Sequence, residues 1–147
     1  KKKHINSIYQ NYKKARRFNE LFPKLEELYM NDYEFLSDLC WEHLSFWLEE
    51  LQIKTKIIRA SQLPVKGYKS DLILQICKYC KADHYISGIH GKNYLEIDKF
   101  LSEGIIVEFQ EFMHPQYPQL YGDFLPFMGI VDFCMNTHEV SLITGGR

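Results

Sequence analysis

The feature that most constrains the fold is a set of three short apolar runs, rich in β-branched and aromatic residues, that alternate with helical patterns. The runs lie at residues 53–59, 84–87 and 105–109, and helical patterns at 71–81 and 94–102 separate them. Strands that alternate with helices through short connections predict right-handed crossovers and a parallel sheet. We therefore expect an α/β fold with a β-α-β-α-β, Rossmann-like parallel sheet.

Along the chain, helical segments are expected before and after this sheet. Residues 1–51 carry apolar side chains at helical spacing, and the apolar run at 125–136 predicts a last helix. We therefore expect a single α/β domain over residues 1–147, in which the helical segment is followed by a core at 52–147. The chain opens without Met inside a basic helical run, so a piece of a longer protein also fits the sequence.

The net charge and the hydropathy of the chain limit which kinds of partner we expect it to bind. The formal net charge is −1, which argues against nucleic acid, because a nucleic-acid surface normally needs a basic excess. Positive charges do gather in residues 1–17, where they fit either an anion contact or a solvated helix face. No apolar stretch of about 18 residues is present, so we expect no membrane span and a cytoplasmic protein.

The four cysteines do not form the pattern of a metal site. Cys77 and Cys80 make half of a zinc or redox motif, but no second pair stands at a suitable spacing. Both lie in an apolar helical run, where cysteines are more often small core residues. Reduced thiols also fit the cytoplasm. We therefore expect no metal and no cofactor.

Candidate binding loops follow the expected strands. Open parallel sheets bind ligands beyond the carboxyl ends of their strands. Three loops fall at that edge in this interpretation, at residues 59–61, 87–92 and 112–119. Arg59, which opens the first of them, is expected to contact the substrate.

The turn at 87–92 is the most specific local feature, with the sequence SGIHGK. Gly88 and Gly91 allow close backbone approach and positive φ. Backbone N–H groups beyond Ser87, together with Lys92, could hold a phosphate or carboxylate, and His90 could exchange a proton. An ordinary tight connection with an exposed histidine explains the turn equally well.

The loop at 114–119, HPQYPQ, is the second candidate. Its two prolines restrict the backbone, while His114 offers acid–base chemistry, Tyr117 a hydroxyl and Gln119 an amide. Asp132 lies in an apolar run and therefore needs a partner, so we expect it to orient a histidine or support a loop backbone such as this one. A partly exposed helix residue is the alternative for Asp132. A packed surface loop with a hydrogen-bonded histidine is the structural alternative.

The residues of both candidates belong to an ordered series of short motifs. The series comprises His4, FPKLEELY at 22–29, IKTKIIRAS at 53–61, ADHYISG at 82–88, GKNYL at 91–95, Gly104 with VEFQ at 107–110, HPQYPQ at 114–119, and FLPFMGIVD at 124–132 with Asn136. Taken together, these motifs resemble the WbqC-like protein family over roughly residues 3–142. His90 stands where that family usually has Gly. Its amino-terminal His-Gln-Pro segment has no counterpart here, so the chain corresponds to the central and C-terminal part.

The resemblance implies a transferase of surface polysaccharide biosynthesis, in particular of O-antigen. It implies transfer of glycine or another aminoacyl group to a sugar or nucleotide-linked acceptor. Under this hypothesis the catalytic residues are His114, as the general base, with Tyr117 and Asp132. The substrate, a small anionic or nucleotide-linked molecule, is bound by Ser87, Gly88, Gly91, Lys92, Gln119 and Arg59.

A second hypothesis is a non-catalytic module that recognises a sugar nucleotide or a partner enzyme. It predicts ligand binding without turnover, together with tolerance of His114→Ala and loss of binding in Lys92→Glu. Modification of nucleic acid is a third hypothesis, which the near-zero net charge disfavours.

Overall fold

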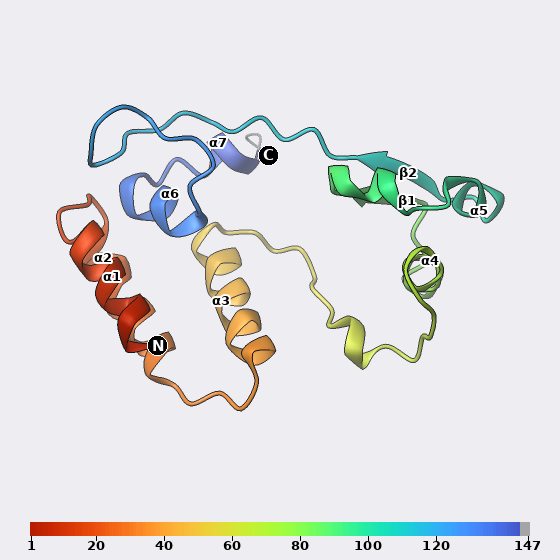
Figure 1. Cartoon of the computed structure of the whole chain (residues 1–147), viewed down its shortest axis with the longest axis horizontal. Coiled ribbons are helices and arrows are strands. Elements are labelled where there is room, and N and C mark those ends of the chain that lie inside the picture. The colour runs from red at the N-terminus through yellow and green to blue at the C-terminus, as the bar shows by residue number, and fades with distance from the viewer. Residues whose placement is uncertain (145–147) are drawn as a thin grey trace. The chain divides into compact units, whose positions relative to one another are not determined.

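The computed structural model describes residues 1–144, which divide into two compact units (Figure 1). Unit 1 consists of Lys1–Thr55 together with the chain from His114 onward, and unit 2 consists of Lys56–Met113. Unit 2 is therefore an insertion in the sequence of unit 1, because the chain leaves unit 1 after α3 and returns to it at His114.

Unit 1 is helical. Its helices are α1 (Lys2–Tyr12), α2 (Phe18–Met30), α3 (Leu36–Glu50), α6 (Ile130–Asn136) and α7 (Ser141–Thr144). Leu21, Leu25 and Met135 are fully buried in its core, where Trp47 and Phe133 also lie. Burying these large side chains supplies the main favourable term for the unit, at roughly 1.5–3 kcal/mol for each one.

Arg17, in the turn between α1 and α2, ties that turn to α6. Its backbone N–H donates to the carbonyl of Met135 at 3.0 Å, and its guanidinium donates to the carbonyl of Cys134 at 3.5 Å. Glu20 and Glu50 pair with the same guanidinium. Arg17 therefore satisfies carbonyl groups near the end of α6 that have no partner within the helix.

Unit 2 contains a parallel pair of strands with helices against one face. Its elements are η1 (Ala60–Gln62), α4 (Ser70–Tyr79), β1 (His84–Ser87), η2 (Ile89–Asn93), α5 (Ile97–Ser102) and β2 (Ile106–Phe109). His84 lies opposite Ile106, and Ser87 lies opposite Phe109. The side chains that alternate to the inner face pack on a core of Leu74, Cys77, Leu95, Phe100 and Ile105.

The predicted β-α-β-α-β sheet is wrong. Within residues 1–144 the sheet has two strands, β1 and β2, and residues 53–59 form no strand. Gln52 takes a positive φ of 56°, and the N–H of Ile53 donates to the carbonyl of Leu48, so this stretch begins by capping α3. It then crosses from unit 1 to unit 2, which leaves its β-branched side chains without a neighbouring strand.

Other predicted elements are present, and the last of them is shorter than expected. α4 occupies the helix expected at 71–81, and Gly104 follows α5 with a φ of +75°, as expected for a glycine cap. The last long helix begins at Ile130, not at 125, because Pro126 and Gly129 interrupt the pattern before it. None of the helices formed by residues 1–144 has the length and hydrophobicity needed to cross a membrane.

Candidate functional site

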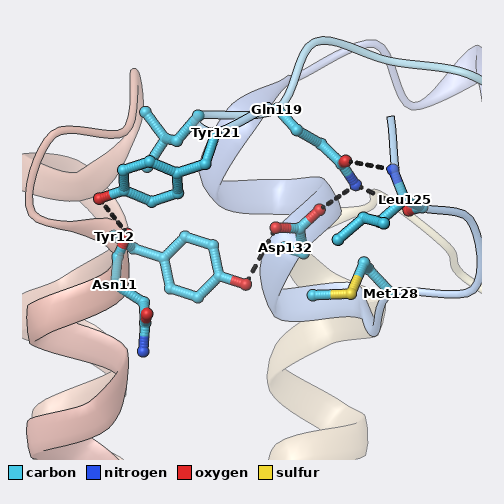
Figure 2. Close-up of a pocket in the computed structure, with 8 residues that line it drawn as sticks. Asn11, Tyr12, Gln119, Tyr121, Leu125, Met128 and Asp132 are labelled. Carbon is cyan, nitrogen blue, oxygen red and sulfur yellow. Dashed lines mark hydrogen bonds between the residues drawn. The ribbon is translucent and has the colours of Figure 1, made fainter. Parts of the chain in front are cut away.

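The buried carboxylate of Asp132 is the centre of a hydrogen-bond network in unit 1 (Figure 2). Its Oδ1 accepts hydrogen bonds from the Tyr12 hydroxyl at 2.9 Å and from the Asn136 amide at 3.2 Å. Its Oδ2 accepts from the Tyr117 hydroxyl and the Gln119 amide, both at 2.9 Å. These four bonds occupy the accepting positions of the carboxylate.

Three separate pieces of backbone bring these groups together. Asp132 lies in the first turn of α6, and Asn136 follows one helical turn later. Tyr12 is the last residue of α1, whereas Tyr117 and Gln119 come from the loop that follows unit 2. Because a lone buried charge is costly, this arrangement of donors stabilises the carboxylate and at the same time fixes the loop.

The network also holds both tyrosines in their protonated form. The pKa of Tyr117 is raised from 10.0 to about 12, chiefly by burial and then by its hydrogen bond to Asp132. Burial and the hydrogen bond to Asp132 likewise raise the pKa of Tyr12 well above its usual range. Both hydroxyls therefore remain donors at neutral pH and do not act as bases.

A cavity of about 300 Å³ opens beside this network. Figure 2 shows the rings of Tyr12 and Tyr121 on one side of it, with Leu125 and Met128 on the other. Asn11, Gln119, Leu120 and Asp132 complete its lining. Its volume lies at the lower end of the roughly 300–1,000 Å³ that is typical of small-molecule sites, and a mostly apolar wall with a few polar groups is also typical of them.

His114 lies in an aromatic cluster next to the wall of this cavity and is not part of its lining. Its ring centroid is 5.5 Å from that of Phe127, 5.8 Å from that of Phe124 and 6.0 Å from that of Tyr117. Nδ1 lies 2.8 Å from the carbonyl oxygen of Pro115. A carbonyl can only accept, so Nδ1 carries a proton and donates it to this contact.

The two other residues predicted in this loop have defined structural roles. The Tyr117 side chain is buried, with 6% of its surface exposed, and its hydroxyl bonds to Asp132. Gln119 lines the cavity, but its amide group is engaged with both backbone groups of Leu125 and with Asp132. The catalytic role of Tyr117 and the substrate-binding role of Gln119 stay predictions.

In unit 2, the turn after β1 is closely packed. A Cβ on Gly91 would lie 2.1 Å from Ser87 Oγ, so only glycine fits there without a shift. Gly88 has a φ of −63° and open space around its Cα, so it does not require glycine. The Ser87 hydroxyl donates to the Gly88 carbonyl at 3.1 Å, and Lys92 Nζ lies 5.2 Å from the centroid of the Phe109 ring.

Arg59 was predicted to contact the substrate because it would follow a strand, and the structure removes this reason. Arg59 is half-buried and precedes η1, and it does not follow a strand, because residues 53–59 form none. Of the cavity lining, sequence reasoning named Gln119 and Asp132 and missed the other residues. Tyr12 falls in the helical pattern of residues 1–51 without any functional signal, and Asn11, Tyr121 and Met128 carry no spacing signal, because the fold brings them together from distant segments.

Within the part of the chain that the structure describes, no three or more His, Cys, Asp and Glu side chains group in a way that could hold a metal ion. All four cysteines are free thiols. The geometry thus defines a mixed α/β protein whose candidate site is a cavity positioned by a buried aspartate.

Comparison with known proteins gives the family. The chain belongs to the WbqC-like protein family, whose model matches residues 1–143. It is 26% identical over 137 residues to the uncharacterized protein Rv1507c of Mycobacterium tuberculosis; the match covers 92% of this chain and 59% of that relative. The chain thus spans about three fifths of the length of this relative. No solved structure matches it.

Proposed function

We propose that this protein is a transferase of surface polysaccharide biosynthesis, O-antigen included, that adds glycine or another aminoacyl group to a sugar or nucleotide-linked acceptor. Membership of the WbqC-like family supports this proposal at the level of the pathway. The observation that carries it at the level of the molecule is the cavity beside Asp132, with an oriented histidine behind its wall.

The proposal gives the aspartate network a positioning role. Asp132 fixes Tyr117 and Gln119, which lie three and five residues after His114 along the same loop. The Pro115 carbonyl fixes the tautomer of His114, so that Nε2 carries the lone pair that a general base needs. Asp132 itself has no accepting position left for a substrate proton.

The proposed chemistry is acyl transfer. The nitrogen or oxygen of the acceptor forms a bond to the carbonyl carbon of an activated aminoacyl donor, and the bond from that carbon to the leaving group breaks. His114 Nε2 takes the proton that the acceptor loses and returns it to the leaving group. His114 packs against Phe124 and Phe127, the residues that immediately precede Leu125 and Met128 of the cavity wall, so the reacting group of the acceptor would extend past this wall.

Lys92 is the proposed contact for an anionic group of the donor or acceptor. Its ammonium group is exposed on the turn that Ser87 and Gly91 hold in a fixed shape. The proposal also includes a cytoplasmic location, where nucleotide-linked precursors and reduced thiols are found; the four free cysteines support it.

The test uses cells of the source organism from which the gene has been deleted. Surface polysaccharide from these cells is compared by mass spectrometry after the full-length gene is restored as wild type, as His114→Gln or as His138→Gln. His138 is a matched control, because it is an exposed histidine of unit 1. We expect deletion to remove the mass of one aminoacyl group, and wild type and His138→Gln to restore it.

His114→Gln is expected to restore the modification at a rate lower by about a hundredfold, the lower end of the effect of a general base. A polysaccharide of unchanged mass after deletion would contradict the transferase. Full restoration by His114→Gln would remove His114 from the mechanism.

The alternative, a non-catalytic module that binds a sugar nucleotide or a partner enzyme, also has an observation in its favour. The titratable groups nearest the cavity are committed elsewhere, since Tyr12 and Tyr117 donate to Asp132 and Asp132 is saturated. This alternative predicts that the cavity binds its ligand with unchanged affinity in His114→Gln and that the purified protein releases no product.

A further inference from the structure

Among the hydrogen-bonding groups that line the cavity of unit 1, most donors already have a partner, whereas several acceptors have lone pairs left. The Tyr12 hydroxyl donates to Asp132, and the Tyr121 hydroxyl donates to the Asn11 carbonyl at 3.3 Å. Both N–H bonds of the Gln119 amide are also used, on Asp132 and on the Leu125 carbonyl. What these groups still offer to a ligand is therefore the lone pairs of the two tyrosine oxygens and the second lone pair of Gln119 Oε1, whose first accepts from the Leu125 N–H.

Asn11 is the remaining polar residue of the lining. One N–H bond of its amide donates to the carbonyl of Ser7 at 2.8 Å, which leaves its other N–H bond and its Oδ1. Among the side chains of the lining, free acceptors thus outnumber free donors. A ligand with O–H or N–H groups can donate hydrogen bonds to these acceptors. A ligand that has only acceptors forms no hydrogen bond with them and leaves them without a partner.

The charge of the site points in the same direction. The carboxylate of Asp132 forms part of the lining, and among residues 1–144 no cationic side chain does so. A phosphate or carboxylate placed in the cavity would approach a like charge in a partly desolvated place. The walls made by the Tyr12 and Tyr121 rings and by Leu125 and Met128 favour a compact group with an apolar face (Figure 2).

We propose that this cavity binds the sugar ring of the acceptor, as a neutral or amine-bearing monosaccharide whose hydroxyl or amino groups donate to Tyr12 Oη, Tyr121 Oη and Asn11 Oδ1. A sugar ring has donors around its rim and C–H groups on its faces, and it matches both the free acceptors and the tyrosine rings. A nucleobase fits less well, because its ring acceptors would find a single free side-chain donor. This inference rests on the proposed function and identifies which part of the substrate enters the site.

The four methionines allow a direct test. Met128 lines the cavity, Met135 is buried in the core of unit 1, and Met30 and Met113 are exposed and not part of the lining. The full chain is labelled with ¹³C at the methionine methyl groups, and the signals are assigned from single Met→Leu variants. The probes are methyl glucoside, glucosamine, glucuronic acid, uridine and inorganic phosphate, each titrated at neutral pH.

We expect glucosamine and methyl glucoside to shift the Met128 signal saturably, while Met30 and Met113 keep their positions. Glucuronic acid, uridine and phosphate are expected to bind at least tenfold more weakly at Met128. Tyr121→Ala is expected to weaken sugar binding by about fivefold, the value of one ring contact. Tyr79→Ala is the matched control, because Tyr79 is a similarly exposed tyrosine of unit 2.

Three results would overturn the inference. The first is that glucuronic acid or phosphate binds at Met128 as tightly as the neutral sugars do. The second is that no sugar shifts the Met128 signal. The third is that Tyr121→Ala leaves sugar binding unchanged. Because binding is read without turnover, these results are separate from those for the transferase. Sugar binding with no aminoacyl change in the deletion strain would leave this inference standing and remove the transferase.

Discussion

The Asp132 network and the turn at Ser87–Lys92 both contain polar residues, but these residues are held in place by different kinds of contact. Around Asp132, side chains from α1, α6 and the loop at 114–119 converge on one buried charge, and a cavity is left beside them. In the turn, the chain packs on itself, with Gly91 against Ser87 and with Lys92 exposed. The first is a long-range tertiary construction, and the second is a local one.

The comparison shows that a conspicuous motif and a candidate site need not coincide. The glycines of the turn suggested an anion cradle, yet Gly91 is required by its close approach to Ser87, and Gly88 is not required by space or by φ. The Asp132 network has no compact motif, and it nevertheless holds the polar groups of a cavity. The two tryptophans, Trp41 and Trp47, lie in α3, so fluorescence reports on unit 1 alone and allows the two regions to be tested separately.

The largest effect is expected from Asp132→Ala. This change leaves the hydroxyls of Tyr12 and Tyr117 and the Gln119 amide without their acceptor, and it should lower the free energy of unfolding of unit 1 by about 3 kcal/mol. The measurement is urea unfolding followed by tryptophan fluorescence. Asp71→Ala is the control, since Asp71 is an exposed aspartate of unit 2 paired with Lys99, and it should leave this signal unchanged.

The next effect is expected from Gly91→Ala in unit 2. A new Cβ would meet Ser87 Oγ at 2.1 Å and a Leu95 methyl group at 2.9 Å, so the turn must shift at a cost of about 2 kcal/mol. Hydrogen exchange of the Gln110 amide, which donates to the Ser87 carbonyl, reports the local stability. Gly88→Ala meets no atom within 4 Å and should leave this exchange rate nearly unchanged. Equal effects of the two changes would contradict the packing role of Gly91.

A smaller effect is expected from Tyr117→Phe, and it should depend on pH. The pKa of Tyr117 rises from 10.0 to about 12 on folding, chiefly through burial and then through its bond to Asp132. The folded state therefore retains this proton, and the associated stability is complete below pH 10 and is lost as the pH rises toward 12. Tyr117→Phe should lower stability at pH 7 by about 1 kcal/mol and flatten the fall between pH 10 and 12.

Tyrosine absorbance combined with unfolding at each pH provides the measurement for this prediction. Tyr94→Phe, at an exposed position of unit 2, provides the control. A slope above pH 10 that Tyr117→Phe does not alter would show that another group carries the alkaline transition.

The smallest effect is expected at acid pH from His43 of α3, whose ring packs against α2. Its ring packs on Tyr29 at 4.8 Å between centroids, and Nε2 is buried with no hydrogen-bond partner among the described residues. Burial lowers the pKa of His43 below 6.5, so the unfolded state binds the proton more readily. The stability gained from neutral His43 is thus complete above pH 6.5 and is lost as the pH falls below it.

His43→Phe should reduce the acid dependence of unit 1, read as the fluorescence midpoint in urea between pH 7 and pH 5. His84→Phe is the matched change in unit 2, at an exposed histidine beside Asp83, and it should not alter this signal. Identical pH profiles for His43→Phe and wild type would contradict the assignment.

Local patterns predicted local structure well. The strands at His84–Ser87 and Ile106–Phe109 and the helix at Ser70–Tyr79 follow from side-chain periodicity, and Gly104 was recognisable as a helix end. The failure at 53–59 has a definite cause. β-branched residues favour an extended chain, but a strand also needs a neighbour to accept its hydrogen bonds, and Ile53 instead caps α3 where the chain leaves unit 1.

The candidate site was predictable only in part. His114, Tyr117 and Gln119 lie close together in a loop with two prolines, and an aspartate in an apolar run signals its need for partners, so the support of this loop by Asp132 could be expected. The identity of those partners could not be. Tyr12 is separated from Asp132 by 120 residues, with the whole of unit 2 between them.

By itself, the sequence determined the family, the local helices and strands, and the presence of a buried acid that must be satisfied. These depend on residue types and short spacings, which a single chain displays directly. Only the tertiary structure decided that Tyr12 satisfies this acid, that Asn11, Tyr121 and Met128 line a cavity beside it, and that 53–59 has no strand to pair with. The physical reason is that these outcomes depend on which distant surfaces pack together, and packing is a property of the assembled core and not of any local run.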